Sequence, residues 1–249
     1  MSETITAAVL VIGDEILSGR TQDTNTHYIA RLLDTLGIDM REARVVPDVE
    51  AEIVAAVNAL RARYTYVFTT GGIGPTHDDI TADAVAKAFG VGIDYHPEAL
   101  AMLAARYQPG EFNEMRKRMA RIPNTASLIK NTASTAPGFQ IGNVFVMAGV
   151  PMVMRAMMED VTPRLKKGVV VTTATVSARI AEGRIAGPLA KIQAANKSVV
   201  IGSYPFYTAD GYGVQLVVRG RDAASVEAAA AEIELAIASE GLSSERISP

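Results

Sequence analysis

Residues 66–81 have the sequence Tyr66-Val67-Phe68-Thr69-Thr70-Gly71-Gly72-Ile73-Gly74-Pro75-Thr76-His77-Asp78-Asp79-Ile80-Thr81. The apolar, β-rich run over residues 64–69 predicts a buried strand. Three glycines within the next few residues let the backbone turn sharply and approach a ligand without obstruction from Cβ atoms. The stretch therefore predicts a ligand site at the end of a strand rather than a plain connection.

The helix predicted after this turn begins near Asp79 and runs to Phe89, with Thr76 or Asp78 as its N-cap. Its free N–H groups and the positive end of its dipole would face the turn, where an anion is stabilised. The adjacent carboxylates of Asp78 and Asp79 would repel a phosphate, unless a cation bridges them or one of them takes part in chemistry. We expect His77 to be an exposed bystander.

The composition of the chain excludes several classes of protein and of functional site. The 249 residues with 49% hydrophobic content can bury two moderate cores. A formal charge of -3 offers no basic field for a polynucleotide, so we expect no nucleic-acid partner. Cysteine is absent, which excludes disulfides, thiolate metal ligands and a cysteine nucleophile. No apolar run approaches the ~20 residues of a membrane span, and residues 1–4 lack the basic start of a secretory signal, so we expect no membrane partner and a cytoplasmic location.

Two domains are predicted, residues 1–166 and 167–249. In the first, apolar runs alternate with amphipathic stretches, the α/β pattern of a mostly parallel sheet. Its predicted strands are residues 7–12, 39–46, 64–69 and 144–147, and its predicted helices are residues 25–36, 49–63, 79–89, 97–107, 111–120 and 152–165. Residues 123–142 are rich in Thr, Ser, Asn, Pro and Gly and predict a long functional loop, which we consider a candidate lid.

The second domain is predicted to be a small α+β unit. Its strands are expected over residues 169–179, 199–204 and 214–219, and its helices over residues 187–195 and 223–239. The polar tail after Gly241 is expected to fray.

Three further segments follow predicted strands and are expected to meet the glycine turn, because ligands in open α/β sheets bind outside the carboxyl ends of the strands. The first supplies carboxylates, a hydroxyl and a helix cap with spare hydrogen-bonding capacity, from Gly13, Asp14, Glu15, Ser18, Gly19 and Asn25. The second supplies Asp48, and the third supplies Gly149 and Pro151. Asp and Asn at strand ends also cap helices and close turns without any chemistry, and this interpretation stays open for each of them.

Four motifs together resemble the molybdopterin-binding MoaB/Mog superfamily, and within it the CinA (competence/damage-inducible protein) branch. They are residues 69–81, Gly13-Asp14-Glu15-Ile16-Leu17-Ser18-Gly19, Thr135-Ala136-Pro137-Gly138-Phe139 and Ala148-Gly149-Val150-Pro151. The resemblance covers about residues 5–165, and residues 168–240 resemble the following KH-type domain of CinA in element order. It implies a three-layer MoaB/Mog-like fold, a pocket for a pterin or a nucleotide diphosphate, and a homo-oligomer, either a dimer or a trimer.

The resemblance also implies roles for residues. Asp48 and Asp79 match carboxylates that act on molybdopterin, and Asp14 matches the acidic residue of the first loop. Relatives in the CinA branch are associated with divalent-metal-dependent cleavage of ADP-ribose, and related domains of FAD synthases with cleavage of FAD. We therefore predict Asp48, Asp78 and Asp79 as catalytic and Asp14 and Asp79 as ligands of Mg²⁺, Mn²⁺ or Co²⁺. The predicted ligand-binding residues are Gly13, Asp14, Glu15, Ser18, Gly19, Asn25, Thr70, Gly71, Gly72, Gly74, Pro75, Thr76, Thr81, Gly149 and Pro151.

Two departures separate the sequence from this family. Val153 stands where the family commonly has a glutamate, and the loss of such a carboxylate would slow catalysis by up to ~10²–10⁴-fold while leaving binding intact. The sequence also stops where CinA would continue into its nicotinamide-nucleotide amidase domain, so we do not expect that activity.

Two classes of function remain open. The preferred one is a metal-dependent pyrophosphatase acting on ADP-ribose or FAD. The alternative is a molybdopterin-binding protein of the molybdenum-cofactor pathway or a non-catalytic nucleotide binder. RNA binding by the second domain is disfavoured, because it lacks a basic Gly-x-x-Gly loop.

Overall fold

The computed structural model describes residues 4–108, 110–208 and 211–247. The chain divides into two compact units, Met1–Gly168 and Val169–Pro249. Each unit has its own hydrophobic core and is described by itself.

The first unit is built on a six-stranded mixed sheet with the order β2-β1-β3-β8-β7-β6. Four strands are parallel: β1 (Thr6–Ile12), β2 (Asp39–Val46), β3 (Tyr66–Thr70) and β8 (Val144–Met147). Two short strands, β7 (Gly138–Ile141) and β6 (Ser127–Ile129), continue the sheet antiparallel from β8. The predicted parallel part is confirmed, and β6 and β7 make the sheet mixed.

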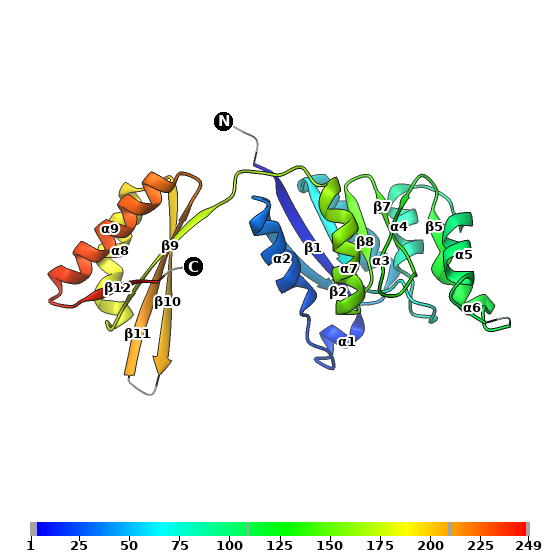
Figure 1. Ribbon diagram of the computed structural model, residues 1–249, viewed down its shortest axis with the longest axis horizontal. Helices are drawn as coiled ribbons and strands as arrows, with labels where there is room; N and C mark the ends of the chain where they lie inside the picture. The colour runs from blue at the N-terminus through cyan, green and yellow to red at the C-terminus, as the bar shows by residue number, and fades with distance from the viewer. Residues whose placement is uncertain (1–3, 109, 209–210, 248–249) are drawn as a thin grey trace. The chain divides into compact units, whose positions relative to one another are not determined.

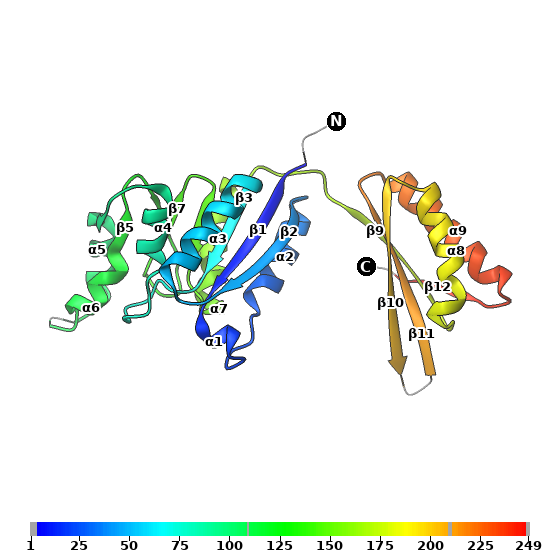
Figure 2. The same cartoon turned by 180° about the vertical axis from the view of Figure 1, so that it is seen from behind.

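Helices cover both faces of this sheet, which gives the expected three layers (Figure 1, Figure 2). One face carries α3 (Glu50–Arg63), α4 (Thr81–Phe89) and α5 (Pro97–Ala104), and the other carries α2 (Asn25–Thr35) and α7 (Pro151–Val161). Strand β1 shows why both faces need cover. Ala8 and Leu10 pack on the α3 side while Ala7 and Val9 pack on the α2 side, as the two-residue period of a strand requires.

The prediction of a long loop over residues 123–142 is wrong, because β6 and β7 lie within it. Leu128, Ile129, Phe139 and Ile141 are buried, so their short apolar runs are strands that complete the core. Between the two strands, the side chain of Asn131 accepts hydrogen bonds from the N–H groups of Ala133 and Ser134, and this closes the remaining turn.

The helix predicted over residues 111–120 is also wrong in extent. The structure has the short helix α6 (Glu114–Lys117), capped by Asn113, followed by the 3-10 helix η1 (Arg118–Ala120). The chain then becomes extended, because β5 (Arg121–Pro123) pairs with β4 (Ile93–Tyr95) in a separate two-stranded sheet. Two other short elements are α1 (Asp14–Leu17) and η2 (Thr162–Arg164).

The second unit is an antiparallel sheet of order β10-β11-β9-β12, with α8 (Glu182–Ala195) and α9 (Ala223–Ser239) packed on it. Its strands are β9 (Thr172–Ala178), β10 (Val199–Thr208), β11 (Gly211–Gly220) and β12 (Ser244–Ile247). The expected α+β class is confirmed.

Two expectations for this unit are wrong. The tail does not fray, because residues 244–247 pair with β9 as β12. Helix α8 begins at Glu182 rather than at residue 187 and carries Pro188 inside it. Ile185 is completely buried against the sheet, and this burial extends the helix ahead of the proline.

None of the helices in the described ranges is both long enough and apolar enough to cross a bilayer.

Candidate functional site

The four parallel strands bring the predicted segments to one edge of the sheet. Hydrogen bonds continue the strand pairing beyond the strand ends, because Gly13 N donates to Val46 O over 3.2 Å and Gly71 N donates to Met147 O over 3.1 Å. The loops after β1, β2, β3 and β8 therefore start side by side. This edge is the candidate site.

The glycine turn, residues 71–74, has a shape that requires glycine. Gly71 and Gly72 have φ angles of 105° and 66°. A Cβ atom on Gly71 would lie 2.1 Å from Ile12 O, and one on Gly72 would lie 2.1 Å from Thr81 Oγ1. Backbone conformation and space therefore both exclude a side chain at these two positions.

Thr81, the first residue of α4, holds the turn in place. It is completely buried, its N–H donates to Gly72 O over 3.0 Å, and its hydroxyl donates to Gly71 O over 3.1 Å. Because both donors are used within the protein, Thr81 positions the turn.

Three N–H groups of the turn are unused. Within the described parts of the chain, the N–H groups of Gly72, Ile73 and Gly74 donate to no other residue. Successive free N–H groups in a turn with positive φ angles form a concave site for an anion. The glycine turn thus has the donors for a phosphate oxygen.

Helix α4 begins at Thr81 after Ile80 and has no side-chain cap, so the predicted capping by Thr76 or Asp78 is wrong. Thr76 instead bonds to Asp79. The Oδ2 atom of Asp79 accepts from Thr76 N over 2.8 Å and from Thr76 Oγ1 over 2.5 Å. A Cβ atom on Gly74 would lie 2.6 Å from that oxygen, so the bare backbone of Gly74 leaves room for the carboxylate.

Four carboxylates gather on the β1 and β2 side of the turn, and we call Asp14, Glu15, Asp48 and Asp78 the acidic group. The N–H of Asp14 donates to Asp48 Oδ2 over 3.0 Å. Burial raises the pKa of Asp48, that hydrogen bond opposes the rise, and repulsion from the other three carboxylates adds to it. Asp78 is exposed to solvent. Repulsion at Asp48 would be relieved by a bound cation.

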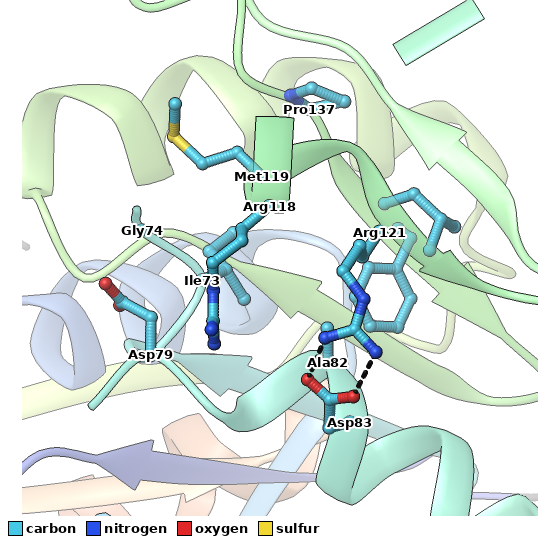
Figure 3. Close-up of a pocket in the computed structure, with 12 residues that line it drawn as sticks. Ile73, Gly74, Asp79, Ala82, Asp83, Arg118, Met119, Arg121 and Pro137 are labelled. Atoms are coloured by element: carbon cyan, nitrogen blue, oxygen red, sulfur yellow. Dashed lines mark hydrogen bonds and ion pairs between the residues drawn. The ribbon is translucent and has the colours of Figure 1, made fainter. Parts of the chain in front are cut away.

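A pocket lies on the other side of the turn (Figure 3). Gly72, Ile73, Gly74 and Asp79 form one wall, and the opposite wall comes from α4, η1, β5 and β7 through Ala82, Asp83, Arg118, Met119, Arg121, Ile122, Pro137 and Phe139. Arg121 and Asp83 form a two-pronged ion pair with N–O distances of 2.9 and 2.7 Å.

The loop after β8 contacts the same turn. Asn25, which is 6% exposed, donates from Nδ2 to Gly149 O over 2.7 Å, and a Cβ atom on Gly149 would lie 3.3 Å from the Cα atom of Gly71. Asn25 therefore presses this loop against the turn. The buried atoms Asn25 Oδ1 and Thr70 Oγ1 have no hydrogen-bond partner in the described part of the chain.

Comparison with known proteins agrees with this arrangement. Residues 8–167 match the family described as "Probable molybdopterin binding domain". The chain belongs to this family. Residues 170–245 match the family described as "FAD synthase, middle domain".

Similar proteins support the assignment to the molybdopterin-binding-domain family. A CinA-like protein from Citrifermentans bemidjiense is 41% identical over 165 residues, which cover 64% of this chain and 40% of the relative. A protein from Thermococcus kodakarensis is 40% identical over 174 residues, which cover 64% of this chain and 69% of the relative. The crystal structure of the protein CinA, of unknown function, from Thermoplasma acidophilum is 34% identical with a TM-score of 0.61, over 65% of this chain and 98% of that one.

The resemblance to the MoaB/Mog superfamily and to CinA is therefore confirmed. The chain spans about 40% of the length of the CinA-like relatives. The KH-like identity of the second unit stays a prediction.

Val153 occupies the position where the resemblance predicts a glutamate. It is the third residue of α7, 8% exposed, and packs in the core between α7 and the sheet. A glutamate at the third position of a helix often bonds back to the N-cap N–H. The family's glutamate thus has a structural interpretation beside the catalytic one.

Other predicted residues lie at the edge of the site or make local contacts. The Ser18 hydroxyl donates to Glu15 O over 3.3 Å, and Gly19, with φ of 71°, closes the turn after α1. Pro151 is the exposed first residue of α7, and Pro75 is half-buried in the loop before α4.

Sequence reasoning missed the far wall of the pocket, formed by Asp83, Arg118 and Arg121. One signal was present. Two arginines stand among three apolar residues in the run Arg118-Met119-Ala120-Arg121-Ile122, and apolar residues of these types are the ones most often buried.

Proposed function

We propose that this protein is a metal-dependent pyrophosphatase that cleaves the diphosphate of a nucleotide such as ADP-ribose or FAD. One observation carries the proposal, namely that the acidic group and the unused N–H groups of the glycine turn meet at one edge of the sheet. The match of the second unit to a family named for FAD synthase supports a ligand of this class, because FAD contains a diphosphate.

The donor atoms fit a hard divalent cation. They are carboxylate oxygens, and the pKa of Asp48 is raised first by burial and further by repulsion from the other three carboxylates. The described residues contain no group of three or more His, Asp or Glu side chains arranged to hold a metal. A Mg²⁺ ion commonly takes only one or two carboxylates and fills its other positions with water and substrate phosphates, so two acids are sufficient.

Asp14 and Asp48 are the proposed metal-holding pair, because the Asp14 N–H bonds to the Asp48 carboxylate and brings both to one place. The sequence predicted Asp14 and Asp79 as the metal ligands, and this proposal replaces Asp79 with Asp48. When bound, the cation would neutralise the diphosphate and make its phosphorus more electrophilic.

The protein's own groups would perform the remaining steps. The N–H groups of Gly72, Ile73 and Gly74 hold phosphate oxygens and stabilise charge that develops on them. Asp79 is oriented by Thr76 through Oδ2, while its Oδ1 accepts no hydrogen bond from any described residue. We assign Asp79 as the general base that takes a proton from the attacking water. Water adds to one phosphorus, the bridging P–O bond breaks, and ADP-ribose yields AMP and ribose 5-phosphate.

The test is AMP release from ADP-ribose and from FAD with Mg²⁺, Mn²⁺ or Co²⁺, and with EDTA. Asp79→Asn should lower kcat by about 10²–10⁴-fold, the range for loss of an acid or base. Asp48→Asn removes a charged ligand of the proposed cation and should lower the rate at a fixed Mg²⁺ concentration. Glu159→Gln is the matched control, since Glu159 is an exposed acid in the second half of α7, and it should leave the rate unchanged. Full activity of Asp79→Asn, or turnover that persists in EDTA, would contradict the proposal.

The alternative is a binding protein for molybdopterin or for a nucleotide without catalysis. The family's description favours a pterin ligand. Absence of AMP release with every metal, combined with pterin binding that survives EDTA, would establish this function instead.

A further inference from the structure

We propose that Arg118 is the cationic residue that recognises a phosphate of the ligand and selects for ligands that carry a diphosphate. This inference rests on the proposed function, because it names the group that distinguishes the substrate class at the same site.

Arg118 stands where a ligand on the glycine turn would meet it. It is half-buried in η1 and lines the pocket whose other wall contains Gly72 and Gly74. Figure 3 shows its guanidinium directed into the pocket, between the carboxylate of Asp79 and the ion pair of Arg121 with Asp83. The cation therefore faces the free N–H groups of the turn across the pocket.

Three of the four carboxylate oxygens of Asp79 and Asp83 are engaged elsewhere, and Oδ1 of Asp79 accepts no hydrogen bond from any described residue. Both carboxylate oxygens of Asp83 accept from Arg121, and Oδ2 of Asp79 accepts twice from Thr76. As far as the described residues go, the Arg118 side chain makes no hydrogen bond, ion pair or ring contact. Partial burial removes some of the water that would hydrogen-bond to the guanidinium, and no described residue replaces those hydrogen bonds. An anion in the pocket would supply the missing partner.

The chemistry of that anion follows from the guanidinium. Its planar fork of N–H donors matches two oxygens of one phosphate and forms charge-assisted hydrogen bonds with them. Backbone N–H groups on the opposite wall add donors without adding charge. A phosphate between the two would be held from both sides.

The position of Arg118 also gives the ligand a direction. Strands β1 and β2, whose following loops carry Asp14, Glu15 and Asp48, lie on one side of β3, and β7 with the far wall of the pocket lies on the other. One phosphate of a diphosphate would therefore lie toward the acidic group with its cation, and the second would lie toward Arg118. A nucleoside without phosphates would gain nothing from this arrangement.

Binding and kinetics of Arg118 variants test the inference. The ligands are ADP-ribose for turnover with Mg²⁺ and, for calorimetry with Mg²⁺, its α,β-methylene analogue, which lacks the cleavable P–O–P bridge. Adenosine serves as the ligand without phosphate. Arg118→Met should weaken binding of the analogue by about 10- to 100-fold and raise KM similarly, while kcat changes by less than about threefold, because the lost contact is one or two charge-assisted hydrogen bonds. Adenosine affinity should not change.

Two further variants separate this role from a structural one. Arg118→Lys keeps the charge but loses the fork and should fall between wild type and Arg118→Met. Lys117→Met removes the same charge one residue earlier, from a side chain that pairs with Glu114 outside this pocket, and should leave Kd and KM unchanged. Thermal unfolding of all three should match wild type.

The outcomes are distinguishable. Wild-type affinity for the analogue in Arg118→Met, with AMP release intact, would overturn the role of Arg118 and leave the pyrophosphatase proposal standing. Weakened analogue binding in Arg118→Met, with no AMP release by any form of the protein, would support Arg118 and contradict catalysis. Absence of both analogue binding and AMP release in the wild type would overturn both proposals.

Discussion

The surroundings of Asp48 disfavour the ionised form of its carboxyl group. Its carboxylate is half-buried beside Asp14, Glu15 and Asp78, and its pKa is raised. For an acid, a folded-state pKa above the unfolded one means that folding favours the protonated form. Folding stability is therefore lost as pH rises from the unfolded pKa through the folded pKa, and the loss is complete above both. The charge on Asp48 therefore lowers the folding stability at the residue where the proposed cation would bind.

Asp48→Asn should consequently raise the Tm at pH 7.5, where the wild type carries the full penalty, and should change it less at pH 3.5, where the carboxyl is mostly protonated in both states. The asparagine Oδ1 can still accept from Asp14 N, so the loop after β1 keeps its anchor. The measurement is thermal unfolding across this pH range, with Glu159→Gln as the control that should show no such trend. An Asp48→Asn protein less stable than wild type at pH 7.5 would show that the charge is stabilised rather than strained.

At the scale of elements, the sequence predicts strands that turn residues separate from their surroundings and misses short strands inside polar segments. The bounds of β2 and β8 agree with the predictions. Gly37 and Pro47 mark the ends of β2, and β8 is a continuous apolar run between Gly142 and Gly149. Strands β6 and β7 have three and four residues within a Thr- and Ser-rich segment, too short for any period to appear. In the candidate site, the glycine turn and the acids are visible as local motifs. Arg118 is missed because only folding brings residue 118 opposite residue 74.

The junction between the glycine turn and α4 gives a prediction at this scale. Gly72→Ala should destabilise the protein by about 1–3 kcal/mol, because it combines a positive φ angle with a clash against the Thr81 hydroxyl. Gly19→Ala is the matched control, because Gly19 also has a positive φ angle but a Cβ atom there would meet no other atom within 4 Å. This substitution should lower the free energy of unfolding by only about 1 kcal/mol. Urea unfolding would compare the two variants. Equal losses would mean that the Thr81 contact adds nothing to the requirement for glycine.

The whole molecule consists of two units, and every residue of the proposed site lies in the first of them, Met1–Gly168. The solved CinA protein from Thermoplasma acidophilum is matched over 98% of its length by 65% of this chain, so a protein of this extent forms a stable structure by itself. The second unit matches a different family and has a separate core.

A fragment that ends after residue 170 should therefore fold and release AMP from ADP-ribose within about threefold of the full chain's kcat/KM, because all proposed catalytic and binding groups remain. Circular dichroism would check the fold, and the AMP assay would check the activity. A folded fragment with no activity, beside an active full chain, would show that the second unit contributes to the site.

The far wall of the pocket has a consequence for how such proteins diverge. Arg118 and Arg121 are carried by η1 and by β5, which pairs with β4 in the two-stranded sheet and not with the central one. Arg118 and Arg121 are half-buried, whereas Ala120 and Ile122 belong to the core that also contains residues of β1, β3 and β8. Natural drift, or a library directed at residues 118 and 121, can thus retune which molecule the pocket accepts while the proposed groups at the strand ends are inherited unchanged.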